Sequence, residues 1–210
     1  MTEEQSTPID KSEKKGRRGY VAPDDERKIA TKRFINPEDP INQAQIEIFE
    51  KVLVHQEKNG PIPGFPEVIE IVRENDRPVG YKQKWIEGKP LRTYLNERKR
   101  LFSIEEAKRL YETLVGLHDI IGQPHGDVAE NGVFTSQNLL ITEDEKGTPQ
   151  FNFVDYGGTS DFDIASERAM ALQALFIRKP FSTATDRSSY VEGTDQERME
   201  VFRELQAQTK

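Results

Sequence analysis

The stretch of sequence that decides the fold covers residues 117–158 and reads LHDIIGQPHGDVAENGVFTSQNLLITEDEKGTPQFNFVDYGG. Asp127 follows a His-Gly pair, Asn138 opens an apolar run, and Asp155 ends a second apolar run before Tyr-Gly-Gly. Mg²⁺ beside phosphate prefers carboxylate and amide oxygens, because it is a hard cation that also keeps several waters. The pattern predicts a magnesium and phosphate site, for which phosphoryl transfer is the natural chemistry.

The segments around this stretch have clear periodicities. Upstream, Ser103 and Glu106 match a capping box, and apolar residues follow at helical spacing up to Leu117, so a helix is expected to begin at Ser103. Apolar runs bounded by turn residues predict short strands, and helical spacing predicts two more helices near the C-terminus. The expected strands and helices cover residues 138–142, 150–155, 163–178 and 195–208.

The N-terminal half has a different pattern. Two pairs of β-rich runs, each pair separated by Pro- and Asp-containing turns, predict two hairpins, and one segment with helical spacing lies between them. The runs cover residues 16–22 with 28–35 and 65–73 with 79–86, and the helix covers 41–56. The expected fold class is therefore α+β, with a small antiparallel sheet and one helix in the first half and a mostly helical second half.

Composition excludes several classes of protein. The chain has 210 residues, no Cys and a net charge of −7, which removes disulfides, thiolate catalysis and Cys-ligated zinc and argues against a broad nucleic-acid surface. No apolar run reaches the ~20 residues of a transmembrane helix, and the first residues lack the apolar stretch of a secretory signal. Residues 1–15 are polar without periodicity, which predicts a disordered leader.

With these residues in order, the sequence resembles the protein-kinase-like superfamily. His125-Gly-Asp127 resembles its catalytic-loop motif, Asn138 with the following strand resembles its metal-binding asparagine, and Asp155-Tyr-Gly157 resembles its Asp-Phe-Gly turn. The resemblance implies that Asp127 orients the attacking hydroxyl and accepts its proton. It also implies that Asn138 and Asp155 hold Mg²⁺ against the phosphates of ATP.

The resemblance extends into the first half of the chain. Ile29-Ala-Thr-Lys32 resembles the strand whose lysine binds the α- and β-phosphates, and the resemblance implies a helix glutamate as the partner of Lys32. Glu47 is the expected partner, with Glu50 as the alternative. Gly16 to Val21 resembles a shortened glycine-rich loop, in which Gly16, Gly19 and Val21 would approach the nucleotide.

Two further segments match parts of the same family. Residues 84–91 resemble the link between the two lobes, in which Lys84 and Ile86 would contact the adenine. Asp163, at the start of the expected helix 163–178, is the expected brace of the catalytic loop. The resemblance thus divides the chain into the leader, an ATP-binding N-lobe over 16–86 and a reduced C-lobe over 87–210.

The departures from the family pattern leave alternatives open. Ten residues separate Asp127 from Asn138, so Asn131 is a rival metal ligand, and Ala129 stands where many protein kinases have a lysine that aids transfer. Only residues 158–162 separate the Asp155 turn from the next expected helix, which leaves no room for a long activation loop. Such a chain resembles minimal kinases that bacteria deliver into host cells, and small kinase-like proteins associated with tRNA modification.

The leading hypothesis is an ATP- and Mg²⁺-dependent protein kinase of minimal size with a Ser/Thr acceptor. The alternatives are a kinase-like ATPase or small-molecule phosphotransferase, and a catalytically silent binding module. The expected partners are ATP, a protein substrate and an activating protein, with no membrane and no nucleic acid. The expected location is the cytoplasm, or the host cytosol for a delivered effector.

Overall fold

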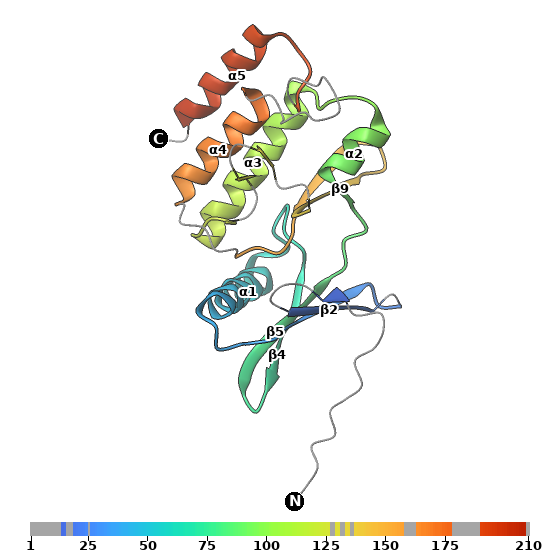
Figure 1. The fold of residues 1–210 in the computed structure, drawn as a ribbon, viewed down its shortest axis with the longest axis vertical. Helices are drawn as coiled ribbons and strands as arrows, with labels where there is room; N and C mark the ends of the chain where they lie inside the picture. The colour runs from blue at the N-terminus through green and yellow to red at the C-terminus, as the bar shows by residue number, and fades with distance from the viewer. Residues whose placement is uncertain are drawn as a thin grey trace, which may run out of the picture.

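The computed structural model of the chain describes residues 14–15, 19–24, 26–126, 129–130, 133–134, 137–157, 163–177 and 190–208. Its elements form two lobes (Figure 1). The N-terminal lobe holds a five-stranded antiparallel sheet and helix α1. The C-terminal lobe holds four helices, a three-stranded sheet and a two-stranded one. The α+β, two-lobed architecture expected from the sequence is confirmed.

The sheet of the N-terminal lobe has the strand order β1-β2-β3-β5-β4. Its strands are β1 (Lys14–Lys15), β2 (Gly19–Asp24), β3 (Ile29–Phe34), β4 (Val68–Glu74) and β5 (Arg77–Lys84). Both expected hairpins are present, as β2–β3 and β4–β5. Strand β1 pairs with β2 and lies in the last two residues of the expected leader, while the rest of the leader lies outside the described residues.

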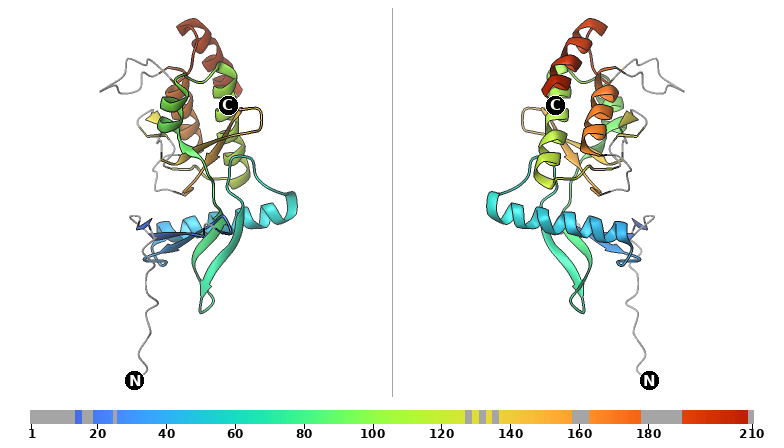
Figure 2. Two further views of the ribbon diagram at one scale, coloured as in Figure 1. Left: turned by 90° about the vertical axis from the view of Figure 1, so that its right-hand side faces the viewer. Right: turned by 90° about the vertical axis from the view of Figure 1, so that its left-hand side faces the viewer.

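Helix α1 (Pro40–Asn59) lies between this sheet and the C-terminal lobe (Figure 2). It begins at Pro40 because the Asp39 carboxylate accepts a hydrogen bond from the Ile41 N–H at 2.9 Å, and proline suits the first helical turn. The aromatic ring of Phe49, on α1, stacks on Tyr81 of β5 with the ring centroids 3.6 Å apart, and it also contacts Phe65. These aromatic contacts fix α1 against the inner face of the sheet.

The C-terminal lobe is built around α3 (Ile104–Ile121). The expected capping box is present, with Glu106 N–H donating to Ser103 Oγ and Ser103 N–H donating to Glu106 Oε2. Leu110, Leu114 and Leu117 of α3 are fully buried. Helices α4 (Ile164–Phe176) and α5 (Asp195–Gln208) stack beside α3 (Figure 1), at the positions that the sequence predicted.

The remaining elements of this lobe are short. Strands β9 (Leu139–Glu143) and β10 (Pro149–Phe153) form the expected hairpin, and β6 (Lys89–Pro90) pairs with β9 ahead of helix α2 (Leu91–Arg98). Strands β7 (Ala129–Glu130) and β8 (Val133–Phe134) pair within the ten residues that separate Asp127 from Asn138. Among the described residues, no helix has the length and apolar character needed to cross a membrane.

Candidate functional site

Lys32 lies on β3 and reaches across to the C-terminal lobe. Its ammonium group forms an ion pair with the carboxylate of Asp155 and donates a hydrogen bond to Gln45 Oε1 at 3.1 Å. The Lys32 side chain is only 12% exposed, whereas that of Asp155 is 53% exposed. The fold therefore brings a strand of one lobe and a turn of the other into direct electrostatic contact.

Gln45 of α1 joins these groups and occupies the place expected for a glutamate. Its Nε2 donates to Asp155 Oδ1 at 3.2 Å and to the Tyr156 carbonyl, while its Oε1 accepts from Lys32. A carboxylate could not donate these two bonds and would repel Asp155, so the amide suits this position.

The expectation that Glu47 or Glu50 would pair with Lys32 is wrong. Glu47 is exposed, because two residues along a helix turn the side chain by about 200° away from Gln45. Glu50 instead accepts a hydrogen bond from Arg73 Nη2 at 2.6 Å.

The β9–β10 hairpin places Asn138 and Asp155 side by side. Leu139 pairs with Phe153, and beyond that pair the Val154 N–H donates to the Asn138 carbonyl at 2.9 Å. Asp155 then adopts a left-handed backbone with φ of 57°, which is uncommon outside glycine and concentrates at functional sites.

The donor set fits Mg²⁺, which takes one or two protein oxygens and keeps waters for its other positions. Asn138 supplies an amide oxygen and Asp155 a half-exposed carboxylate. Within the described part of the chain, no three His, Asp or Glu side chains gather as a larger metal cluster.

The charge state of Asp155 is set by its neighbours. Burial would raise the pKa of its carboxyl, but the positive charge of Lys32 and the hydrogen bonds from Lys32 and Gln45 outweigh it. The net effect holds the pKa of Asp155 below its ordinary value, so the group stays an anion that can bind a cation.

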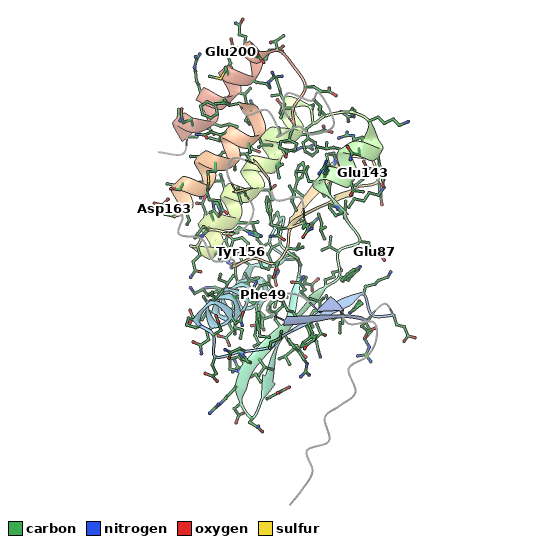
Figure 3. All side chains as sticks on the ribbon, viewed as in Figure 1. Phe49, Glu87, Glu143, Tyr156, Asp163 and Glu200 are labelled. Atoms are coloured by element: carbon green, nitrogen blue, oxygen red, sulfur yellow. The ribbon has the colours of Figure 1, made fainter. Side chains whose placement is uncertain are left out.

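The turn after Asp155 is packed tightly against α1. Tyr156 is fully buried near the lobe junction (Figure 3), where its hydroxyl donates to the Gln123 carbonyl at 2.7 Å. Gly157 has a φ of 101°, and a Cβ there would lie 3.3 Å from the backbone Cα of Gln45. Only glycine suits this combination of backbone angle and close approach.

A buried carboxylate of α4 holds the loop that precedes Asp127. Glu167 accepts hydrogen bonds from the backbone N–H groups of His125 at 2.6 Å and Gly126 at 2.9 Å, and it contacts His118 Nε2 at 2.8 Å. The Arg168 guanidinium donates to His118 Nδ1, which leaves Nε2 as the donor to Glu167.

The same loop is tied to the Asp155 turn by two further hydrogen bonds. The ring of His125 donates from Nε2 to the Val154 carbonyl at 2.9 Å, and the Gly157 N–H donates to the His125 carbonyl at 3.2 Å. Residues 125–126 and the Asp155 turn therefore form one hydrogen-bonded unit.

The expectation that Asp163 would brace this loop is wrong. Asp163 is the N-cap of α4, where its Oδ1 accepts from the Ser166 N–H at 2.7 Å, and its side chain lies at the start of that helix (Figure 3). Glu167 lies one turn further on and shares the buried face of α4 with Ala171 and Leu175. A carboxylate in register with apolar helix positions was the sequence signal for this role.

The other predicted site residues have different placements. Gly19 opens β2 opposite Phe34, and a Cβ there would lie 2.4 Å from the Arg33 carbonyl oxygen, so strand packing alone requires glycine. Val21 pairs with Lys32. Lys84 ends β5 and is exposed, and Ile86 is half-buried in the link to β6. Three predicted or rival site residues lie outside the described residues: Gly16, Asp127 and Asn131.

No family model matches the chain, and no curated protein matches it. Solved structures do match. A single-mutant form of the PknI kinase domain of Mycobacterium tuberculosis aligns with a TM-score of 0.52 and 14% identity over 85% of each chain. A double-mutant form gives 0.46 and 15% identity, over 69% of this chain and 61% of that one. The kinase PK-1 of Cydia pomonella granulovirus gives 0.39 and 17%, over 66% of this chain and 46% of that one.

The alignment to the single-mutant PknI domain extends over both lobes' share of the sequence, and its TM-score exceeds 0.5. The match is consistent with the two-lobed α+β architecture described above. The chain therefore has a protein-kinase-like fold.

Proposed function

We propose that the chain is an ATP- and Mg²⁺-dependent phosphotransferase that modifies Ser or Thr of a protein substrate. The observation that supports this most is the contact of Lys32 with Asp155 across the lobe junction, with Gln45 bonded to both. A cation from one lobe and an anion from the other are the two charges that a metal-bound triphosphate requires from its protein.

Each residue has a distinct role in this proposal. Lys32 would bind the α- and β-phosphates, and Asn138 with Asp155 would hold Mg²⁺, which neutralises charge that develops on the phosphates. Asp127 follows Gly126 directly in sequence, and Glu167 fixes the backbone of Gly126. Asp127 would orient the acceptor hydroxyl and take its proton.

The direct test is transfer of phosphate from radiolabelled ATP to a protein acceptor. Wild type should label the acceptor, Asp155→Ala should not, and the exposed Glu145→Ala should label as wild type does. Thermal unfolding of each variant separates loss of chemistry from loss of fold. Equal labelling by wild type and Asp155→Ala would contradict the proposal.

The short connection after Gly157 favours a second candidate, a kinase-like ATPase or small-molecule phosphotransferase. Asp163 already caps α4, so only residues 158–162 connect it to the Asp155 turn. A protein substrate would then have to dock elsewhere, whereas a small acceptor needs no such segment. Consumption of ATP without labelling of any protein, lost in Asp155→Ala, would favour this candidate over a protein kinase.

A further inference from the structure

Gln45 is buried on the side of α1 that faces the C-terminal lobe, where Tyr156 lies (Figure 3). Its three polar neighbours differ in kind, because the Lys32 ammonium can only donate, whereas the Asp155 carboxylate and the Tyr156 carbonyl can only accept. These partners fix the orientation of the amide, with Oε1 toward Lys32 and Nε2 toward the two acceptors. Position 45 therefore needs a side chain that accepts one hydrogen bond and donates two.

Gln45 and Lys32 both bond the same oxygen of Asp155. The Lys32 ammonium and Gln45 Nε2 each donate to Asp155 Oδ1, and Oδ2 accepts no hydrogen bond from any other described residue. A Lys32 side chain that turns toward phosphates would leave Gln45 still bonded to Oδ1. The carboxylate would then keep its orientation, with Oδ2 open to a metal ion.

The backbone beside this contact leaves little room for adjustment. A Cβ on Gly157 would lie 3.3 Å from both the Cα and the Cβ of Gln45, and the Gly157 N–H donates to the His125 carbonyl on the other side of the turn. The Asp155 turn is thus held between α1 and residue 125. An unsuitable side chain at position 45 cannot move away from Asp155, so its effect must fall on Asp155 and Lys32.

We propose that Gln45 is a positioning residue of the nucleotide site, which orients Lys32 and Asp155 toward a metal-bound triphosphate and must be a neutral amide to do so. The inference rests on the nucleotide-binding function proposed above and names the residue that orients its two charged groups. A glutamate at position 45 would keep the hydrogen bond from Lys32, lose both donated bonds and repel Asp155. The amide is therefore expected to bind nucleotide better than the carboxylate, although the carboxylate is the stronger partner for Lys32 alone.

The first test measures the dissociation constant of ATP with Mg²⁺ on the full chain. Gln45→Met keeps the length of the side chain and removes its three hydrogen bonds, so the dissociation constant should rise about tenfold. Gln45→Glu should raise it by about a further fivefold, because repulsion of Asp155 is added to the lost bonds. A residue that served only as the partner of Lys32 would give the opposite order. Binding by Gln45→Glu as tight as that of wild type would overturn the inference.

The matched control makes the same chemical change on the exposed side of α1. Gln43 lies two residues before Gln45 and is exposed, so Gln43→Glu adds the same charge to the helix without the contact to Asp155. Its dissociation constant should stay within about twofold of the wild-type value, because exposed charges interact weakly. A loss as large as that of Gln45→Glu would mean that the charge of α1, not the contact, sets the affinity, and would overturn the inference.

A second test examines the contact without nucleotide. Gln45→Glu places two carboxylates against each other, so the melting temperature should fall by about 5 °C or more. Addition of Asp155→Asn restores one acid and one amide beside Lys32, so the double variant should melt at a higher temperature than Gln45→Glu. If the losses of the two single variants simply add, the two side chains do not interact and the inference is overturned.

The two proposals fail in different ways. If wild type binds ATP with Mg²⁺ and Gln45→Glu binds it as tightly, the role of Gln45 is wrong and the nucleotide-binding proposal stands. If the double variant recovers stability but wild type binds no nucleotide, the proposed function is overturned, and the role of Gln45 in nucleotide binding is overturned with it.

Discussion

Glu167 and Asp155 are two acidic side chains near the loop at residues 125–126, and they differ in burial and in hydrogen-bond partners. The Glu167 side chain is 2% exposed, and it is bonded to His118 and to two backbone N–H groups. Asp155 is 53% exposed and faces one ammonium and one amide. A carboxylate whose partners are fixed backbone groups holds a loop in place, whereas a carboxylate whose ammonium partner can be replaced by a metal ion is free to bind that ion.

Removal of Glu167 should have the largest effect. Glu167→Ala leaves two backbone donors and His118 Nε2 unpaired in the interior, so we expect the free energy of unfolding to fall by about 3–5 kcal/mol. Chemical denaturation at neutral pH measures it. A loss below about 1 kcal/mol would show that the buried carboxylate does not hold the loop and would remove the contrast with Asp155.

The pH dependence of stability should identify the same group. Burial would raise the pKa of Glu167, but the hydrogen bond from His118, the positive charge on His125 and the backbone hydrogen bond from His125 outweigh it and hold the pKa below its ordinary value. A lowered folded-state pKa stabilises the protein above the unfolded-state value of about 4.3, and this stability is lost as the pH falls. The stability gap between wild type and Glu167→Gln should therefore narrow in acid, as measured by denaturation from neutral pH downward.

The turn that carries Asp155 should respond to a single methyl group. Gly157→Ala forces a side chain into a left-handed backbone and to 3.3 Å from the Gln45 Cα, so we expect a loss of about 1–3 kcal/mol. Gly116→Ala in α3 is the control, since a Cβ there meets nothing within 4 Å and alanine suits a helix better by about 1 kcal/mol. Equal melting temperatures for the two variants would contradict the tight packing of the turn.

Asp155 should matter least for stability and most for ligands. Asp155→Asn removes the charge of a half-exposed carboxylate but keeps an amide oxygen that can accept from Lys32, so we expect a loss of about 1 kcal/mol. In wild type, saturating ATP with Mg²⁺ should raise the melting temperature, because a ligand that binds only the folded state stabilises it. That increase should disappear in Asp155→Asn, and its persistence would place Asp155 with Glu167 as a structural residue.

The sequence predicted those parts of the fold that depend on local pattern. The capping box at Ser103 and the hairpin between Asn138 and Asp155 follow from neighbouring residues, so periodicity and turn chemistry were sufficient. Gln45 was missed because its role depends on which side of α1 faces the other lobe, and Glu167 because its role depends on which side of α4 packs against residues 125–126. A glutamate was expected as the partner of Lys32, whereas the fold uses Gln45, which both donates and accepts hydrogen bonds. Short strand pairs such as β7–β8 contain too few residues to show a periodic pattern in the sequence.

Gln45, the uncharged side chain that bonds both Lys32 and Asp155, has a consequence for the order in which metal and nucleotide bind. Lys32 and Asp155 together carry no net charge. An acidic residue at position 45 would give the three side chains a net negative charge, which would attract divalent ions that carry no phosphate. A divalent ion that binds alone must instead displace the Lys32 ammonium from Asp155, and that ammonium then has no anionic partner. An ion that is already bound to phosphates supplies a new anion for Lys32. Metal and nucleotide would therefore bind together, as a complex.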